Sequence, residues 1–509
     1  MNASHGSQLF PGASESPISL LNLTAFVFST VTLAVFTPSA LVFACKLLKR
    51  LSFAIPFIHD ERDKSLDRCR ELLIEGYRKY PTSSFRMPLF PFGNVLVLNS
   101  RRLINELQNA SDDEFSFSAM TERLNHTAYT ISPNVTKHHR SIVRYALSLN
   151  GHNIFDDVLD EMRGSFADII SLPDNLSGWH AFPAQDTSMK LVYRTSNRFF
   201  VSPALCRNEE YRTLTINFTL DAIKSAYHIN LWPTFLHPIV APLFATSGKY
   251  KRQLMPLLEP IVAERKINLA TYGPNWPEKP RDYITWLLEE DDGNGIYTLD
   301  ELARRVLHIN LAAIHSSSMT LTHALLHLAH KPEYAEILRE EAKRIIHEDG
   351  ASLSIQLAHA MTNGSDTASV TRLAAKDYTF ADGTHVPKGV FVTASLYSTH
   401  NDNEIYKDSS VFNPWRFSDL RAAEEGTEHG IKHQLIDLSS EFLAFGLGRH
   451  ACPGRFISAN QLKAMLCHIV LNYDVNLENE GVRPPNEYVG VSVRPNAHAR
   501  IMFRRRTES

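Results

Sequence analysis

One short segment near the carboxyl terminus constrains the chain more than any other. Residues 445–455, FGLGRHACPGR, place three glycines around Cys452, one of only five cysteines in 509 residues. Glycine lets the backbone approach a neighbouring atom, and backbone N–H groups can then stabilise a thiolate. An apolar helical pattern begins at Gly454, so we expect the sulfur near a positive helix amino terminus. The segment therefore predicts a thiolate that is presented to a metal.

Two other interpretations of this segment are weaker. Zinc sites use several cysteine or histidine ligands, and Cys452 has neither a CxxC partner nor a nearby pair of histidines. A glycine-rich turn with a merely structural cysteine is the common alternative for such a loop, but here too many positions follow one pattern. We therefore favour a ligand role for Cys452 over a merely structural one.

Composition narrows the class of protein. The chain is 44% hydrophobic and 21% charged, as in ordinary folded proteins, and its formal net charge is −3 with no long basic block. These values argue against nucleic acid as a partner. The cysteines are scattered and odd in number, which argues against a disulfide framework and favours a reducing compartment.

The amino-terminal region is predicted to anchor the chain in a membrane. Residues 20–45 carry no charge, and Lys46, Lys49 and Arg50 follow directly. About 25 helical residues at roughly 1.5 Å each exceed a hydrocarbon core of about 30 Å. The basic residues place the rest of the chain in the cytosol. A cleaved signal peptide is the alternative, but the apolar run is long and no basic residue precedes it.

Periodicity predicts a mainly helical protein with small β-sheets. Helical spacing marks residues 62–80 and 101–110, most of 140–345, and 454–473. A strand is expected at 92–100. Residues 378–395 predict hairpins, with turns at Asp382–Gly383 and Pro387–Gly389. We expect two parts: residues 1–50 as anchor and linker, and residues 51–509 as the main domain.

The cysteine segment resembles the haem-ligand signature of the cytochrome P-450 family, F-x-x-G-x-[RH]-x-C-x-G. The matching residues are Phe445, Gly448, His450, Cys452 and Gly454. The similarity extends over nearly the whole chain and looks closest to fungal, membrane-anchored members related to ent-kaurene oxidase. It implies the P-450 fold behind a transmembrane helix. It also implies haem b with Cys452 as the axial thiolate, His450 at a haem propionate and Phe445 beside the sulfur.

Three arginines are assigned roles by the same resemblance. Arg416, in NPWRF, matches the structural arginine of a P-x-R-F element, and Arg372, five residues before Asp377, matches a strand arginine that pairs with a haem propionate. By itself Arg372 would be an ordinary surface charge. Arg144 lies where a helix usually supplies a second propionate contact, although Arg140 and Arg144 could equally form one solvated helix face.

Residues 310–329 form an apolar helical pattern with polar residues in its middle, which alone fits a core helix as well as a site. The resemblance aligns residues 312–317 with the family's [AG]-G-x-[DE]-T-[TS] groove over the haem. His315 then replaces the acid, Ser316 the threonine, and Ser317 follows it. A hydroxyl and an imidazole can still relay protons during oxygen activation, so these three residues are the catalytic candidates.

One family element has no counterpart where it is expected. The family carries a helical E-x-x-R whose residues join the later arginine in a buried charge cluster, yet residues 351–369 contain neither Glu nor Arg. The E-x-x-R strings at Glu336 and Glu341 belong to the preceding amphipathic pattern. If Arg416 were buried without these partners, the cost would be about 3–5 kcal/mol. A diverged or degraded copy and a mis-spliced coding sequence both remain open explanations.

The resemblance implies a monooxygenase in the endoplasmic reticulum membrane, with a single span and a cytosolic catalytic domain. It would use O₂ and NADPH through a separate NADPH–cytochrome P-450 reductase, because no flavin- or nicotinamide-binding motif is evident. Its expected substrate is an apolar, terpenoid-like molecule of fungal secondary metabolism, which it would oxidise, most simply by hydroxylation. Two alternatives are a haem-binding copy without turnover and a redox-neutral haem-thiolate isomerase.

Overall fold

The structure is a computed structural model. It describes residues 55–58, 68–89, 91–131, 151–173, 178–291, 297–347, 368–423, 433–479 and 481–506. From Pro56 onward these residues belong to one compact unit, Pro56–Ser509. Within these ranges no helix is both long and apolar enough to cross a membrane. The predicted span at 20–45, Arg144 and the segment 351–367 lie outside the described residues.

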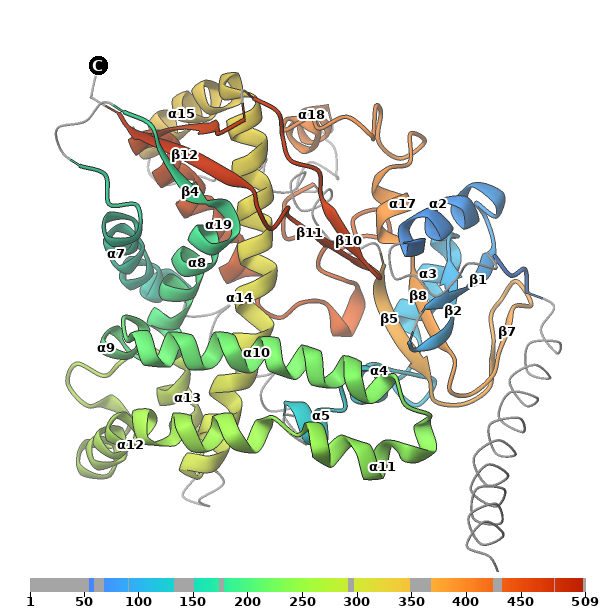
Figure 1. Cartoon of the computed structure of the whole chain (residues 1–509), viewed down its shortest axis with the longest axis horizontal. Helices are drawn as coiled ribbons and strands as arrows, with labels where there is room; N and C mark the ends of the chain where they lie inside the picture. Colours follow the sequence, from blue (N-terminus) through green and yellow to red (C-terminus); the bar gives the residue numbers. More distant parts are fainter. Residues whose placement is uncertain are drawn as a thin grey trace, which may run out of the picture. The chain divides into compact units, whose positions relative to one another are not determined.

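A long helix, α14 (Leu299–His330), forms the axis of the helical body (Figure 1). The Thr298 hydroxyl caps it by accepting a hydrogen bond from the Glu301 N–H at 3.2 Å. Most of its residues are buried, and its most extensive packing is against α8 (Ala184–Phe200), while α10 (Glu209–Asn230) and α12 (Ser247–Tyr272) also contact it. Because α14 is surrounded by other helices, any exposed residue near its middle calls for a physical explanation.

The other described helices are α2 (Cys69–Lys79), α3 (Arg101–Asn109), α4 (Phe117–Asn125), α5 (Thr127–Thr130), α7 (Gly151–Ile169), α9 (Pro203–Cys206), α11 (His237–Val240), α13 (Tyr283–Glu289), α15 (Pro332–His347), α17 (Leu396–His400), α18 (Arg416–Ala423) and α19 (Arg455–Asn472). Some of them pack around α14, whereas α2, α3 and α17 lie beside the large sheet (Figure 1). Short 3-10 helices are η2 (Thr234–Leu236), η3 (Ala241–Phe244), η4 (Gly273–Asn275) and η5 (Gly448–His450).

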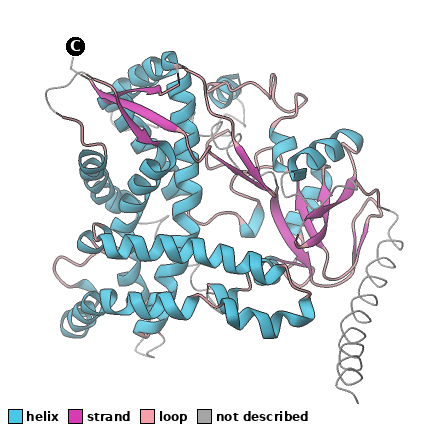
Figure 2. Ribbon diagram, viewed as in Figure 1, coloured by secondary structure: helices cyan, strands magenta, loops and turns pink. Residues whose placement is uncertain are grey.

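The largest sheet has the order β1-β2-β8-β5-β3, and β2 and β8 form its parallel pair. Its strands are β1 (Ser84–Leu89), β2 (Gly93–Leu98), β8 (Phe391–Ala394), β5 (Ser369–Ala374) and β3 (Phe115–Ser116). All four residues of β8 are buried, as expected for a central strand. Figure 2 shows this sheet apart from the main group of helices.

Three smaller sheets complete the described part. A three-stranded sheet has the order β4-β12-β9, with strands β4 (His180–Pro183), β12 (Arg500–Arg505) and β9 (Tyr473–Leu477). Two hairpins are β6–β7 (Tyr378–Thr379 and His385–Val386) and β10–β11 (Glu487–Val489 and Ser492–Arg494).

Most local predictions in the described part are confirmed. The strand expected at 92–100 is β2, the helix expected at 101–110 is α3, and Gly383 turns the β6–β7 hairpin with φ +87°. The predicted helical stretch 140–345 misses one strand, β4. Four residues are too few to show periodicity, and β4 exists because it pairs with β12, more than 300 residues later.

Candidate functional site

The cysteine segment forms a tight loop that contains η5 and leads into α19. The Cys452 N–H donates a hydrogen bond to the Phe445 carbonyl at 2.9 Å and closes the loop. Gly446 and Gly448 have φ values of +69° and +64°, a backbone region that side chains disfavour. The Cys452 side chain packs at the edge of the main hydrophobic cluster, beside the buried Phe445.

This loop docks on the end of α3 through three consecutive residues. A methyl group on Gly448 would lie 2.7 Å from Cγ of Gln108 and 3.2 Å from its carbonyl oxygen. The Arg449 guanidinium donates to the Asn109 carbonyl at 3.2 Å, and His450 Nε2 lies 2.5 Å from a carboxylate oxygen of Asp112. These contacts fix the position of the loop relative to residues 108–112.

The surroundings of the Cys452 sulfur would stabilise a thiolate only if a cation were bound to it. Burial raises the pKa of the Cys452 thiol, although the backbone N–H groups of Gly454 and Arg455 and the charge of Arg455 act in the opposite direction. The loop therefore supplies donors for a thiolate but does not by itself offset the desolvation. A bound metal would supply the missing positive charge.

A bulge in β5 places Arg372 next to the loop. The register of β5 against β8 shifts between Ser369 and Arg372, and Val370 has φ +57°, which is unusual for a β-branched residue. The Ser369 hydroxyl donates to the Leu443 carbonyl at 3.0 Å, which ties this strand to the approach of the cysteine loop. A bulge changes the direction in which a strand side chain points, and here the affected side chain is that of Arg372.

Arg372, Phe117 and His450 form a stack. The Arg372 guanidinium carbon lies 5.4 Å from the centre of the Phe117 ring, and the rings of Phe117 and His450 are 5.3 Å apart with an interplanar angle of 19°. Arg372 is only 5% exposed, so the interpretation of it as a plain surface charge is wrong. The structure thus brings together Arg372 and His450, two of the predicted cofactor-binding residues. The Phe117 ring lies between them, and the sequence analysis did not single out this residue.

Helix α14 crosses α19 just after the cysteine loop. The Ser317 and Ser458 hydroxyls lie 3.0 Å apart at this crossing. One residue earlier, Ser316 is exposed, and so is Ala312 one turn before it, although this part of α14 is otherwise mostly buried. A strip of α14 near the cysteine loop is therefore not covered by protein side chains.

The three catalytic candidates do not share one environment. The Ser316 hydroxyl faces the uncovered strip and makes a long bond of 3.4 Å to the Ala312 carbonyl, whereas Ser317 is buried against Ser458. His315 lines a narrow crevice beside Tyr193 of α8 and Thr219 of α10. Burial, and secondarily the charge of Arg494, lowers the pKa of His315, so its imidazole is neutral at pH 7.

Arg416 is buried and surrounded by backbone oxygens. Its guanidinium donates to the carbonyls of Asp408 at 2.7 Å and Val411 at 3.0 Å, with longer bonds to residues 407 and 409. Burial lowers its pKa. The upstream Glu336–Arg339 pair lies on α15, where Arg339 donates to the Val470 carbonyl at 2.7 Å. That pair therefore serves the packing of α15 on α19, as expected for a chance match.

The arrangement suits a planar, anionic metal cofactor better than a bare ion. Within the described ranges, no group of three or more His, Cys, Asp or Glu side chains could hold a metal. A single sulfur therefore requires a metal that arrives with most of its own ligands. The uncovered strip of α14 offers an open face, and the Arg372 stack offers positive charge for acidic substituents.

An apolar cavity of about 220 Å³ lies where the large sheet meets the β10–β11 hairpin. Its lining includes Met87, Phe92, Val97 and Val489, together with Thr371, the residue before Arg372. Apolar walls with few polar groups are typical of small-molecule sites. The cavity is therefore a candidate for holding an apolar ligand near the bulge.

Comparison with known proteins identifies the family. The family model for cytochrome P450 matches residues 77–362 and 365–502. The chain therefore belongs to the cytochrome P450 family, which implies a haem-thiolate cofactor, and the resemblance read from the cysteine loop is confirmed at this level.

Similar proteins are fungal P450 monooxygenases. Cytochrome P450 monooxygenase 151 of Postia placenta is 39% identical over 449 residues, covering 86% of this chain and 88% of the relative. Cytochrome P450 monooxygenase CYP512U6 of Ganoderma lucidum is 32% identical, covering 87% and 88%. Cytochrome P450 monooxygenase pyr3 of Aspergillus fumigatus is 30% identical, covering 86% and 85%.

A solved structure supports the fold. The retinoic acid-bound cyanobacterial CYP120A1 superposes with a TM-score of 0.62 at 19% identity, covering 89% of this chain and all of that one. At this identity the likeness shows the fold alone. The predicted P-450 fold, mainly helical with small sheets, is thus confirmed for the described part of the chain.

Gly448→Ala should damage the docking of the cysteine loop. The added methyl group would meet Gln108 at 2.7 Å, and φ +64° disfavours alanine, so we expect a loss of about 1–3 kcal/mol in stability. Thermal unfolding should occur at a temperature several degrees lower, with less haem per protein. Gly178→Ala, which has nothing within 4 Å, is the control. Equal unfolding temperatures for the two variants would contradict the docking role.

Proposed function

We propose that the chain is a haem-thiolate monooxygenase that hydroxylates an apolar substrate. The supporting observation is the geometry around Cys452: a single sulfur with backbone donors, an uncovered strip of α14 and the buried Arg372 stack. In this proposal Cys452 ligates the haem b iron. Arg372 and His450 face the propionates, and Arg144 contributes if its helix follows the family pattern. Phe445, Gly448 and Gly454 shape the loop.

The overall reaction consumes O₂, NADPH and a proton, and yields a hydroxylated product, water and NADP⁺. When bound, the haem-thiolate group supplies the activation of O₂ and its insertion into a carbon–hydrogen bond, favoured by electron donation from sulfur. Electrons would arrive through a separate NADPH–cytochrome P-450 reductase. The chain's own residues must bind the substrate, exclude water and deliver protons.

The substrate proposal rests on the apolar cavity. Its lining is dominated by Leu, Met, Phe and Val side chains from the large sheet, the β10–β11 hairpin and helices α2 and α4. Such a lining favours a hydrocarbon skeleton over a charged molecule. A terpenoid-like compound of fungal secondary metabolism fits that chemistry. The fungal relatives are named as monooxygenases, which supports the oxidation but not a particular substrate.

Proton delivery is assigned to Ser316 and His315. Ser316 is the hydroxyl on the uncovered strip, and its bond to the Ala312 carbonyl is long enough to exchange for another partner. His315, one residue earlier, is neutral at pH 7 and can both accept and donate a proton. Ser317 would hold α14 against α19 through Ser458, so it positions Ser316.

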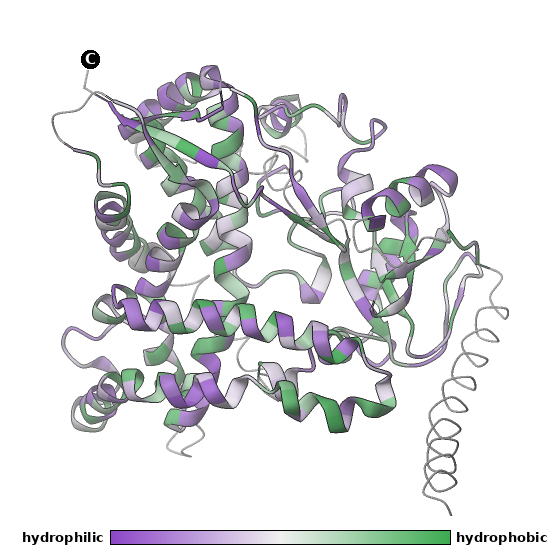
Figure 3. Cartoon of the chain, viewed as in Figure 1, coloured by the Kyte–Doolittle hydropathy of each residue, from purple (hydrophilic) through white to green (hydrophobic). Residues whose placement is uncertain are grey.

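Membrane association is proposed from two features. The uncharged run at 20–45 followed by basic residues predicts a single span in the endoplasmic reticulum membrane, with the catalytic domain cytosolic. The described part adds exposed apolar side chains between α10 and α12, and Figure 3 shows the hydrophobic colouring of this segment. They include Trp232 at 47%, Phe235 at 57% and Leu243 at 79% exposure.

Cys452→Ala tests the metal ligand. It should abolish the thiolate-type absorption band of the reduced carbon monoxide complex and all product formation, because no other cysteine of the described residues belongs to the loop. Cys467→Ala, on the helix α19 that follows the loop, is the matched control and should keep both. A surviving band in Cys452→Ala would disprove the assignment.

The same preparation separates the alternative functions. With reductase present, a normal band without NADPH-dependent turnover would favour the inactive copy. Product formation without NADPH would favour the isomerase. Product formation coupled to NADPH consumption supports the proposed monooxygenase.

Ser316→Ala should leave haem incorporation intact and divert NADPH electrons to hydrogen peroxide, lowering product per NADPH by about tenfold or more. His315→Ala should also lower coupling. Because the folded pKa of His315 is below 6.5, the wild-type relay is intact above that pH and weakens as acid protonates the imidazole. Ser318→Ala, whose hydroxyl donates to the His315 carbonyl, is the control. Wild-type coupling in both test variants from pH 6 to 8 would rule out this relay.

Deleting residues 1–50 tests the anchor. The full chain should resist carbonate extraction, and the deleted chain should become extractable, with weak residual binding through the exposed apolar segment. Adding Phe235→Ser and Leu243→Ser should remove that residual binding, because both side chains are more than half exposed. Equal resistance to extraction with and without residues 1–50 would contradict the anchor.

A further inference from the structure

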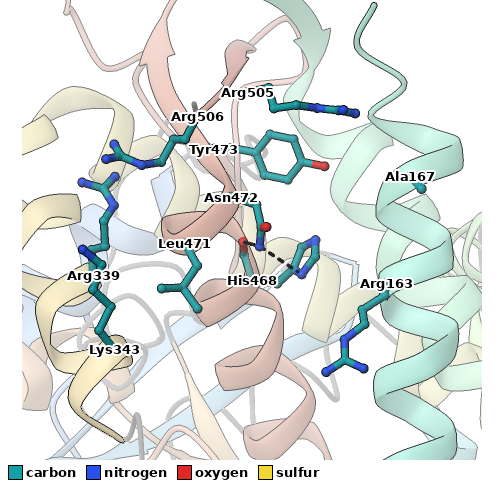
Figure 4. A pocket seen from close by; sticks show the side chains of 10 residues that line it. All are labelled: Arg163, Ala167, Arg339, Lys343, His468, Leu471, Asn472, Tyr473, Arg505 and Arg506. Carbon is teal, nitrogen blue, oxygen red and sulfur yellow. Dashed lines mark hydrogen bonds between the residues drawn. The ribbon is translucent and has the colours of Figure 1, made fainter. Parts of the chain in front are cut away.

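A second pocket lies far from the cysteine loop. It has a volume of about 700 Å³ and is formed by α7, α15, the carboxyl end of α19 and the strands that follow (Figure 4). Its α19 residues, His468, Leu471 and Asn472, come at least 13 residues after the helix begins at Arg455. At 1.5 Å per residue the pocket is roughly 20 Å along the axis from the loop. It is therefore separate from the candidate haem site.

The pocket is strongly cationic. Half of its ten lining residues are basic and none is acidic; the basic ones are Arg163, Arg339, Lys343, Arg505 and Arg506. They come from three separate parts of the chain, with Arg339 and Lys343 on one side and Arg163 on the other (Figure 4). The Arg163 side chain is exposed, and its charge acts on the neighbouring His468. Converging cations repel one another, and a bound anion relieves that repulsion.

Fewer carboxylates than basic side chains surround the pocket. Lys343 pairs with the largely exposed Glu340 at 3.2 Å. Asp474 contacts Arg506 at 2.5 Å, Arg504 at 2.9 Å and Arg339 at 3.4 Å. Although burial opposes it, the hydrogen bonds from Arg504 and Arg506 hold the pKa of Asp474 below its usual value. One carboxylate is thus shared by three guanidinium groups. Glu336, the other acidic partner of Arg339 and Arg506, is 67% exposed.

The centre of the pocket is uncharged and partly aromatic. Burial, together with the nearby Arg163, lowers the pKa of His468 to about 4, so its ring is neutral at physiological pH. The His468 and Tyr473 rings lie 6.1 Å apart, and Leu471 adds apolar surface. A ring or hydrocarbon portion of a ligand could rest there while its anionic portion meets the arginines.

We propose that this pocket binds a phosphate-bearing organic anion of about nucleotide size. Guanidinium groups bind phosphate oxygens in a bidentate manner, and about 700 Å³ is typical for a ligand of that size. Arg339 is only 2% exposed and is held by the Val470 carbonyl, Asp474 and Glu336. The exposed Arg163 and Lys343 are therefore the cations that a ligand meets first. A free nucleotide and a phospholipid headgroup share this chemistry.

Binding is measured on the full-length protein in detergent by titration calorimetry with ATP and with tripolyphosphate. Flotation with phosphatidylcholine vesicles, with or without phosphatidic acid, tests the lipid source. The test variant is Arg163→Gln with Lys343→Gln, two exposed cations from opposite sides of the pocket. The control is Arg102→Gln with Lys266→Gln, which removes the same charge from exposed positions on α3 and α12.

We expect binding in at least one arm, a Kd at least tenfold higher in the test variant, and no change beyond twofold in the control. Affinity should fall as salt rises. Binding of ATP or tripolyphosphate identifies a soluble ligand, and binding only to phosphatidic acid vesicles identifies a headgroup. No binding in any arm, or equal losses in the two variants, would overturn the proposal. A test variant that changes only the KM for reductase would assign the cluster to an acidic protein and overturn it as well.

Discussion

The contact between the 448–450 turn and residues 108–112 is the constraint on which the candidate site depends. Gly448 lies so close to Gln108 that any side chain would collide, and the next two residues are hydrogen-bonded or paired to Asn109 and Asp112. Because the Cys452 N–H is bonded to the Phe445 carbonyl within the same loop, docking of the turn also sets the position of the sulfur. Glycine is required here by space as well as by φ.

Helix α14 and strand β5 pack next to this loop and complete the candidate site. Helix α14 meets α19 at the Ser317–Ser458 contact, which leaves Ser316 on the uncovered strip beside it. Strand β5 is tied to the loop through Ser369, and its bulge directs Arg372 toward Phe117 and His450. The loop, the helix and the strand are separated by 50 to 150 residues in the chain, so only folding brings them together.

The spacing of residues along the sequence predicted those parts of the site that are formed by residues close together in the chain. The spacing of Gly448, His450, Cys452 and Gly454 was sufficient to identify the family, which the family comparison then confirmed over residues 77–362 and 365–502. Helix α3 and strand β2 also followed from periodicity. Phe117 was missed, because an aromatic residue in an amphipathic helix carries no local sign that its ring will lie between an arginine and a histidine.

The sequence by itself determined the presented cysteine and the mainly helical class, because each depends on residues within one or two turns of one another. The hydroxyl and imidazole at 315–317 became candidates only through the family resemblance. Only the tertiary structure decided that His315 lines a buried crevice while Ser316 lies on the uncovered strip, and that five basic residues between 163 and 506 surround one pocket. The physical reason is that burial, pKa and charge clustering arise from contacts between distant segments. Periodicity and spacing report only on neighbours along the chain.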